Sequence, residues 1–182
     1  MNILVQNYVK ELKKHIGKQS RVLEVGSHNV NGGVRQFFKD ADEYIGIDPF
    51  AGKDVDLVAS SYDIPKFFKK ESFDCVICCE MLEHDPYPDW SLQNMKNVLK
   101  PGGWLIISSP GLAQDLHKAP NDYYRFMPDA YLHVFFNGYE NGNLAVGFTK
   151  GYPIPKDPKD IKYTKVVTII GYGQKPNEKK KK

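Results

Sequence analysis

Small and acidic residues gather at a turn that follows a predicted strand of this sequence. Glu24 and Gly26 begin the turn, and residues 27–33 continue it with serine, histidine, asparagine and glycine. A turn of small residues lets backbone N–H groups approach a ligand closely. The pattern Gly-x-Gly-x-x-Gly, which binds a pyrophosphate, is absent. The Glu24 carboxylate is badly placed for a phosphate and well placed for a ligand that carries an ammonium group.

A second acidic residue, Asp48, ends another predicted strand about twenty residues after Gly26. An acidic residue at this spacing can accept hydrogen bonds from both hydroxyls of a ribose. Pro49 and Phe50 follow it and are suited to flank the face of an adenine. The alternative is that Asp48 simply caps its loop. The spacing favours a nucleoside ligand.

The three cysteines, Cys75, Cys78 and Cys79, lie within one short segment. A zinc site would need ligands from a second segment, and the sequence has no second cysteine pair. A disulfide within one strand is disfavoured by geometry. We therefore expect buried, reduced thiols in a cytoplasmic protein, and no metal site.

The net charge of +3 comes from the end of the chain. Residues 175–182 hold five Lys and one Glu, and without their +4 the rest of the chain carries −1. A basic surface that could follow the phosphates of a nucleic acid is therefore not expected. We predict one domain over residues 1–174 and a basic, disordered tail over 175–182, with binding of an acidic partner as the alternative role of the tail.

A sheet must position these residues, because apolar runs alternate with helical stretches. The pattern predicts strands over residues 21–25, 44–48, 55–59, 73–79 and 104–109, and helices over 4–16, 34–39 and 88–99. This alternation indicates a mostly parallel sheet with helices on both faces. In such sheets ligands bind at the carboxyl ends of the strands, where the turns described above lie.

The C-terminal part changes character. Residues 128–136 favour a helix, and strands over 143–148 and 165–172 follow without a helix between them, which predicts an antiparallel hairpin at one edge of the sheet. The expected fold is a single Rossmann-like open α/β sheet. No apolar run is long enough to cross a bilayer, and the first residues favour an amphipathic helix over a signal peptide. The residue pattern does not indicate which oligomeric state the protein has.

Five motifs occur in a characteristic order: VLEVGS, YIGID, VDLV…DIP, FDCVICCEMLEH and NVLKPGGWLIISSPG. Together they resemble the class I S-adenosylmethionine-dependent methyltransferases, and most of all the small-molecule group with LEH after the fourth strand. The resemblance covers residues 21–111. It is looser over HKAPNDYYRFMPDAYLHVFF, which is similar to a stretch of some members.

The resemblance implies S-adenosylmethionine as cofactor and assigns residues to it. The implied cofactor-binding residues are Glu24, Gly26, Ser27, His28, Asp48, Pro49, Ser60, Ser61, Tyr62, Cys79, Glu80 and Met81. In this assignment the first turn holds the methionine part, Asp48 the ribose, residues 60–62 the adenine edge, and residues 79–81 the floor beside the sulfonium. Three features depart from the family: Asn and His replace the later glycines of the first motif, Ser60 stands where an acid is common, and the segment between Asp48 and Val55 is too short for the helix found there in the family.

For the methyl acceptor, His84 is the leading candidate for a general base, because it lies just past the fourth strand. The alternative is that His84 only orders its loop. The candidate acceptor-binding residues are His117, Asp122, Tyr124 and Arg125, with Asp85 as a further one. Arg125 can clamp an acidic group of the acceptor or simply pair with Asp122. The small size favours a small-molecule or saccharide acceptor, methylated on oxygen or nitrogen.

Three other interpretations compete with this one. The run Asp85-Pro86-Tyr87-Pro88 lies too late and lacks the Pro-Pro of enzymes that methylate nucleic-acid bases, so we interpret it as a helix-entry turn. A Tyr-x-x-x-Lys dehydrogenase motif over residues 62–66 is interrupted by Pro65. A catalytically silent binding subunit stays open as an alternative function, although intact Glu24, Gly26 and Asp48 argue against it.

Overall fold

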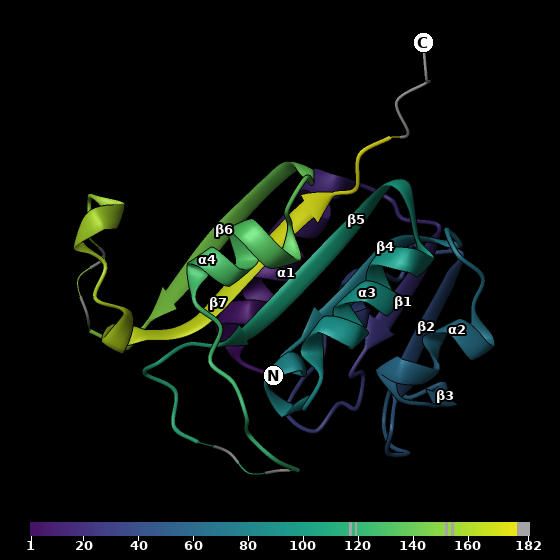
Figure 1. The fold of residues 1–182 in the computed structure, drawn as a ribbon, viewed down its shortest axis with the longest axis horizontal. Coiled ribbons are helices and arrows are strands. Elements are labelled where there is room, and N and C mark those ends of the chain that lie inside the picture. Colours follow the sequence, from purple (N-terminus) through teal and green to yellow (C-terminus); the bar gives the residue numbers. More distant parts are fainter. Residues whose placement is uncertain (117, 119, 152, 154, 178–182) are drawn as a thin grey trace.

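A seven-stranded sheet forms the centre of the computed structural model, which describes residues 1–116, 118, 120–151, 153 and 155–177. The strand order is β3-β2-β1-β4-β5-β7-β6 (Figure 1). The strands are β1 Arg21–Val25, β2 Glu43–Asp48, β3 Leu57–Val58, β4 Phe73–Cys79, β5 Leu99–Pro110, β6 Glu140–Phe148 and β7 Val166–Gln174. Strands β1 to β5 pair in parallel, and β7 lies antiparallel to both β5 and β6. The predicted open sheet with a C-terminal antiparallel hairpin is confirmed.

Helices cover both faces of the sheet, as the alternation predicted. Helix α1 (Ile3–Ile16) begins at Asn2, whose side chain accepts a hydrogen bond from Leu4 N, and it packs on one face through its apolar stripe. The stripe consists of Val5, Val9, Leu12 and Ile16. Helices α2 (Ile64–Phe67), α3 (Pro88–Val98) and α4 (Pro128–Ala130) belong to the other side (Figure 1). Each face of the sheet therefore carries its own apolar core.

Strands β1 and β4 are buried on both sides, which explains their nearly unbroken apolar sequences. Val22, Cys75 and Ile77 point into the core beneath α1, whereas Leu23 and Val76 point into the core beneath α3. These alternate directions follow from the period of two along a strand. The thiols of the cysteines are free and buried, as expected.

Two predicted elements are shorter than expected. The helix predicted over residues 34–39 is a single 3-10 turn, Arg35–Phe37. Its Arg35 guanidinium donates to the main-chain oxygens of Asp54 and Tyr44, which ties the turn to β2 and to the loop that follows it. The strand predicted over residues 55–59 is limited to β3. Just before β3, Asp56 N donates to Gly46 O, and the Asp56 side chain accepts from Gly46 N through Oδ2.

The helix predicted over residues 128–136 is α4 followed by a π-helical turn, Tyr131–Phe135. The side chain of Tyr131 is fully buried, and its hydroxyl donates to Ile169 O at 3.0 Å and lies 2.6 Å from Ser109 Oγ. We attribute the wider turn to this anchoring of Tyr131 on β5 and β7, since π-helical turns commonly mark positions under such constraint.

The predicted domain boundary is wrong for Lys175. Its backbone bonds with Gly102 and Gly103, and its Nζ donates to the main-chain oxygens of Lys96 and Leu99. Lys175 therefore belongs to the folded domain, and the last lysines of the predicted tail lie outside the described residues.

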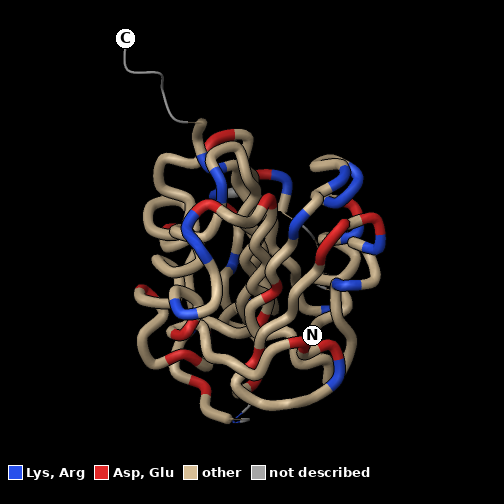
Figure 2. Tube along the Cα trace, turned by 90° about the vertical axis from the view of Figure 1, so that its right-hand side faces the viewer, with Lys and Arg blue, Asp and Glu red and all other residues tan. Residues whose placement is uncertain are grey.

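Charged residues of both signs are mixed along the trace in Figure 2, and Lys and Arg form no continuous stripe on the side shown there. Within the described ranges, none of the helices combines the length and the apolar content that a membrane span requires.

Candidate active site

A cavity of about 750 Å³ lies at the carboxyl ends of β1, β2 and β4. This volume is within the range of small-molecule sites. Its wall takes residues from the turns after β1, β2, β3 and β4, and from the segment that follows β5. The predicted position of the site, at the carboxyl edge of the sheet, agrees with this cavity.

The turn after β1 needs a glycine at position 26. Gly26 has φ +80°, and a Cβ there would lie 2.7 Å from the side chain of Met81. The backbone N–H groups of Gly26 and Ser27 both donate to Ile47 O, at 2.9 and 3.0 Å. The turn is thus fixed to β2, and its backbone stays close to the cavity floor.

Asp48 lines the cavity where β2 ends. Its Oδ2 accepts from His28 N at 3.3 Å, and its Oδ1 accepts from Phe50 N at 2.9 Å. Asp48 therefore caps its loop, which was the alternative interpretation. An ionised carboxylate has about four acceptor positions, so about two are left for ligand hydroxyls. Pro49 and Phe50 line the cavity beside it.

The turn after β3 contributes Ser60, Ser61 and Tyr62 to the cavity wall. Ser60 caps the 3-10 turn Ser61–Asp63: its Oγ accepts from Tyr62 N at 3.0 Å, while Asp63 Oδ2 accepts from Ser60 N at 3.2 Å. This reciprocal cap is a capping box. It fixes the turn and uses one of the two acceptor positions of the Ser60 hydroxyl.

Asp85 joins the turns after β3 and β4. Its carboxylate accepts from the Tyr62 hydroxyl, from Ser91 Oγ and from Tyr87 N, the last at 2.8 Å. The side chain is only 5% exposed and lines the cavity. From the sequence we expected Asp85 on the acceptor side, and the structure places it against the turn after β3 instead.

Three residues that we predicted to bind the cofactor do not line the cavity: Glu24, Ser27 and Cys79. Glu24 is 3% exposed, and its Oε2 accepts from the Tyr44 hydroxyl at 2.7 Å. Burial raises the pKa of Glu24 to about 7, although the Tyr44 hydrogen bond opposes this shift. This placement does not support the expected direct contact between Glu24 and an ammonium group. The predicted contacts of Ser27 and Cys79, both buried, are likewise unsupported.

Glu80 borders the cavity in a left-handed backbone conformation, with φ +55°. Such a conformation is uncommon for a residue other than glycine and often occurs at functional sites. Its Oε1 accepts from Ser108 Oγ at 3.1 Å and from Thr168 Oγ1 at 3.3 Å. Burial raises the pKa of Glu80, and these hydroxyl donors oppose the shift.

Glu83 is a buried carboxyl that the sequence analysis did not single out. Neither of its oxygens has a hydrogen-bond partner among the described residues. Burial, and then the charge of nearby Glu80, raises the pKa of Glu83 well above its usual range. The pair Glu80 and Glu83, three residues apart after a buried strand, was the available signal in the sequence.

His84 lines the cavity and also holds its loop. Its Nδ1 contacts the main-chain oxygen of Asn121, and its Nε2 lies 3.6 Å from Glu83 Oε1. A carbonyl oxygen can only accept, so Nδ1 must carry a proton. In the neutral imidazole, Nε2 is then the nitrogen that can take a proton. Both interpretations of His84 therefore fit the geometry.

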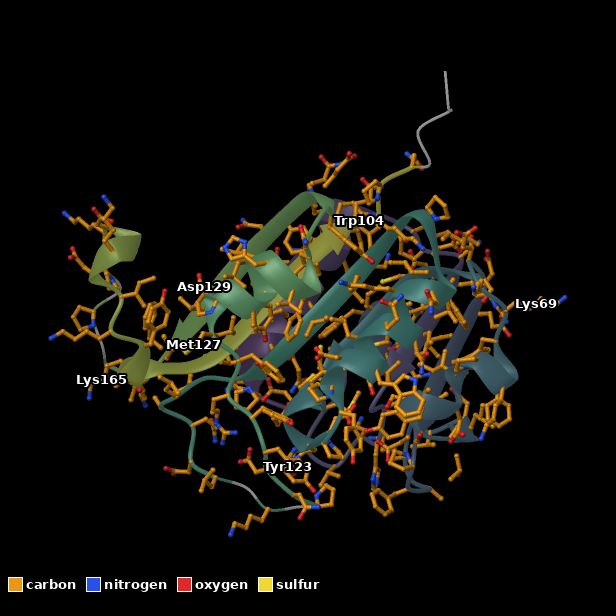
Figure 3. The ribbon with its side chains drawn as sticks, viewed as in Figure 1. Lys69, Trp104, Tyr123, Met127, Asp129 and Lys165 are labelled. Atoms are coloured by element: carbon orange, nitrogen blue, oxygen red, sulfur yellow. The ribbon has the colours of Figure 1, made fainter. Side chains whose placement is uncertain are left out.

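The segment after β5 was expected to supply acceptor-binding residues, and Figure 3 shows Tyr123 where this segment loops past the carboxyl edge of the sheet. Arg125 pairs with Asp122 through two bonds, one of them from Nη2 to Oδ2 at 2.7 Å, and the Tyr124 hydroxyl donates to Pro86 O at 3.1 Å. Asp122, Tyr124 and Arg125 do not line the cavity, whereas Gln114 and Pro120 do. His117 lies outside the described residues.

Residues 34–107 match a family described as "Methyltransferase domain". This match covers the sheet from the end of the first turn to β5, and the remaining strands complete the same fold. This part of the chain is thus similar to methyltransferase domains.

Solved structures support this fold. A SAM-dependent methyltransferase from Archaeoglobus fulgidus superimposes with a TM-score of 0.71 at 15% identity, over 94% of this chain and 93% of that chain. A Burkholderia thailandensis 1,6-didemethyltoxoflavin-N1-methyltransferase, solved with bound 1,6-didemethyltoxoflavin and S-adenosylhomocysteine, superimposes with a TM-score of 0.65 at 14% identity, over 94% of this chain and 78% of that chain.

Among related sequences, a ubiquinone biosynthesis O-methyltransferase from Paraburkholderia xenovorans is 33% identical over 79 residues, 35% of this chain and 34% of that protein. One from Burkholderia ambifaria is 27% identical over 121 residues, 58% of this chain and 52% of that protein. The chain thus spans between one third and about half of the length of these relatives.

The cofactor named for the Archaeoglobus fulgidus neighbour is S-adenosylmethionine. The described residues fit it: the Gly26 turn brings backbone to the cavity, Asp48 keeps acceptor positions for ribose hydroxyls, and Phe50 offers an apolar face for the base.

Proposed function

We propose that the protein transfers a methyl group from S-adenosylmethionine to an oxygen or nitrogen atom of a small-molecule or saccharide acceptor. One observation carries this proposal: the Gly26 turn, Asp48, Glu80 and His84 all line the same cavity. It combines groups suited to a nucleoside with groups suited to a reacting acceptor.

Each of these residues would have its own role. Asp48 would accept hydrogen bonds from the ribose, and the backbone of the Gly26 turn would lie against the methionine part. When bound, S-adenosylmethionine supplies an electrophilic methyl group on a sulfonium. Met81, packed against Gly26, and the half-buried Glu80 side chain would limit the access of water to this end of the cavity.

His84 is the proposed general base. Asn121 fixes the imidazole so that Nδ1 holds its proton and Nε2 can receive one from an acceptor hydroxyl or ammonium group. The names of related sequences and of a structural neighbour support a small-molecule acceptor, since they include ubiquinone biosynthesis O-methyltransferases and a 1,6-didemethyltoxoflavin-N1-methyltransferase. The acceptor pocket would open toward Gln114 and Pro120, which line the cavity beside His84.

The deciding experiment is transfer of a deuterium-labelled methyl group. The protein is incubated with labelled S-adenosylmethionine and fractionated small-molecule extract, and mass spectrometry searches for labelled products. We expect labelled products with the wild type and none with Asp48→Ala. Tight binding of S-adenosylhomocysteine without product from any extract would favour the alternative, a silent cofactor-binding subunit.

A further inference from the structure

The outer edge of β6 is not paired with any strand of the described residues, because β6 ends the strand order and lies beside β7 alone (Figure 1). The ladder on the other side of β7 shows which way the backbone groups point. Gly111 N, just after β5, donates to Val167 O at 3.1 Å, so Val167 bonds toward β5. Alternate residues of an antiparallel strand bond to opposite neighbours, and Thr168 and Ile170 therefore bond toward β6.

The register between β6 and β7 then identifies the outward groups of β6. Gly147 and Ala145 lie opposite Thr168 and Ile170, so the backbone groups of these two residues of β6 bond to β7. The backbone N–H and C=O groups of the alternate residues, Leu144 and Val146, therefore point away from the sheet. Leu144 N donates to the Asn143 side chain of its own strand at 2.7 Å, which agrees with this direction.

The sequence of β6 does not protect this edge. Edge strands are commonly blunted by lysine, by proline, by bulges or by being very short. Residues 141–148 contain no charged residue and no proline. Irregularities of the register flank the strand, but residues 143–147 pair with β7 without interruption. At the opposite edge of the sheet, β3 has only two residues. The β6 edge is thus the one suited to receive a further strand.

The charges that flank β6 fit a second copy of the same strand. Glu140 lies five residues before Ala145, and Lys150 lies five residues after it. Both side chains are exposed, and neither forms an ion pair within the described part of the chain. When a strand pairs antiparallel with its own copy, a two-fold axis passes through its centre. An axis at Ala145 brings each Glu140 to the end of the partner strand that carries the partner's Lys150.

We propose that the protein forms a two-fold dimer in which the β6 strands of two copies pair antiparallel about Ala145 and join the two sheets into one. Leu144 N and Val146 N of each copy donate to the partner's Val146 O and the partner's Leu144 O. The half-buried side chains of Leu144 and Val146 share one face of β6 and are covered by the same two residues of the other copy. Strands β5 and β7 separate this edge from the strands that border the cavity, so the dimer and the proposed function can be tested separately.

The first test uses analytical ultracentrifugation of the full chain over a series of concentrations. The wild type should approach twice the mass of one chain as the concentration rises. Val146→Pro removes an outward N–H group without removing a bond to β7, and proline is tolerated at such positions of edge strands. This variant should stay monomeric while circular dichroism shows that it is folded. Val146→Thr, which keeps the backbone donor and the branched shape, should dimerise.

The second test exchanges charges. Glu140→Lys and Lys150→Glu should each raise the dimer Kd about 10-fold or more, because each replaces two attractive pairs with two repulsive ones. The double variant should return to within about 3-fold of the wild type. In one chain these residues lie about 30 Å apart along the strand, so recovery can arise only between copies.

Three results would overturn the inference. The first is a wild type that stays monomeric at every concentration, as expected if the edge instead receives a strand of another protein. The second is a folded Val146→Pro that dimerises like the wild type. The third is a double charge variant that does not recover. If Val146→Pro does not fold, the charge exchange decides, because Glu140 and Lys150 are exposed.

Discussion

The half-buried Tyr44 donates a hydrogen bond of 2.7 Å from its hydroxyl to Oε2 of the buried Glu24, which joins neighbouring strands near the Gly26 turn. Glu24, which we expected from the sequence to bind a ligand, thus forms a hydrogen bond within the protein instead. Because Glu24 is buried, we expect the free energy of unfolding to depend on pH.

Glu24→Gln should change how stability depends on pH. Burial raises the pKa of Glu24 to about 7 in the folded state, above the ordinary value of about 4.3 in the unfolded chain. A raised pKa stabilises the fold below the unfolded value, and this contribution is lost as pH rises through the folded value. Between pH 5 and pH 8 the wild type should lose about 2–3 kcal/mol relative to Glu24→Gln, measured by urea unfolding.

The control for this prediction is Tyr44→Phe. The Tyr44 hydrogen bond favours the charged form of Glu24, so its removal should move the loss of stability to higher pH. Parallel stability curves for the wild type and Glu24→Gln would show that Glu24 stays ionised across this range.

Asp48→Ala should weaken cofactor binding far more than Asp63→Ala. Both carboxylates cap a turn by accepting a backbone N–H, at 2.9 Å for Asp48 and 3.2 Å for Asp63, so each variant loses a cap worth about 1 kcal/mol. Asp48 would additionally lose two ribose bonds, about 2–5 kcal/mol together. Calorimetry with S-adenosylhomocysteine measures the difference, and equal affinities of the two variants would mean that the ribose lies elsewhere.

His84→Gln should lower kcat by about 100-fold or more, the range of general base catalysis, while the affinity for S-adenosylhomocysteine stays near that of the wild type. A glutamine amide can still donate to the Asn121 carbonyl, so the loop contact can be kept while the base is lost. If kcat is retained and the melting temperature falls, His84 orders the loop and another group accepts the proton.

Arg125→Ala should lower the free energy of unfolding by about 2–3 kcal/mol, because it would leave the buried Asp122 carboxylate without this cation. Our sequence-based hypothesis placed Arg125 in the acceptor pocket, and the pairing with Asp122 favours the structural role instead. Urea unfolding measures the loss, and Asp122→Asn combined with Arg125→Gln should recover part of it. An unchanged stability together with a raised acceptor KM would restore the original hypothesis.

Local sequence patterns determined the strands and the main helices. The apolar runs of β1 and β4 and the stripe of α1 depend on residues close together in the chain, so their bounds could be predicted to within one residue or less. The order of the motifs then indicated the fold class, and the spacing of Gly26 and Asp48 indicated the edge where the cavity lies.

Tertiary structure decided which group each polar side chain binds. The hydrogen-bonded pair Glu24 and Tyr44 is separated by 20 residues in the sequence, and the pair Tyr62 and Asp85 by 23. Asp85 can contact the turn after β3 only when β3 and β4 are both in place. The 3-10 turn at Arg35–Phe37 likewise depends on bonds from Arg35 to Tyr44 and Asp54. A local pattern specifies backbone periodicity and burial, whereas a hydrogen-bond partner is set by which elements pack together. The sequence therefore indicated the edge of the sheet where the cavity lies but not the hydrogen-bond partners of Glu24, Asp85 and Arg125.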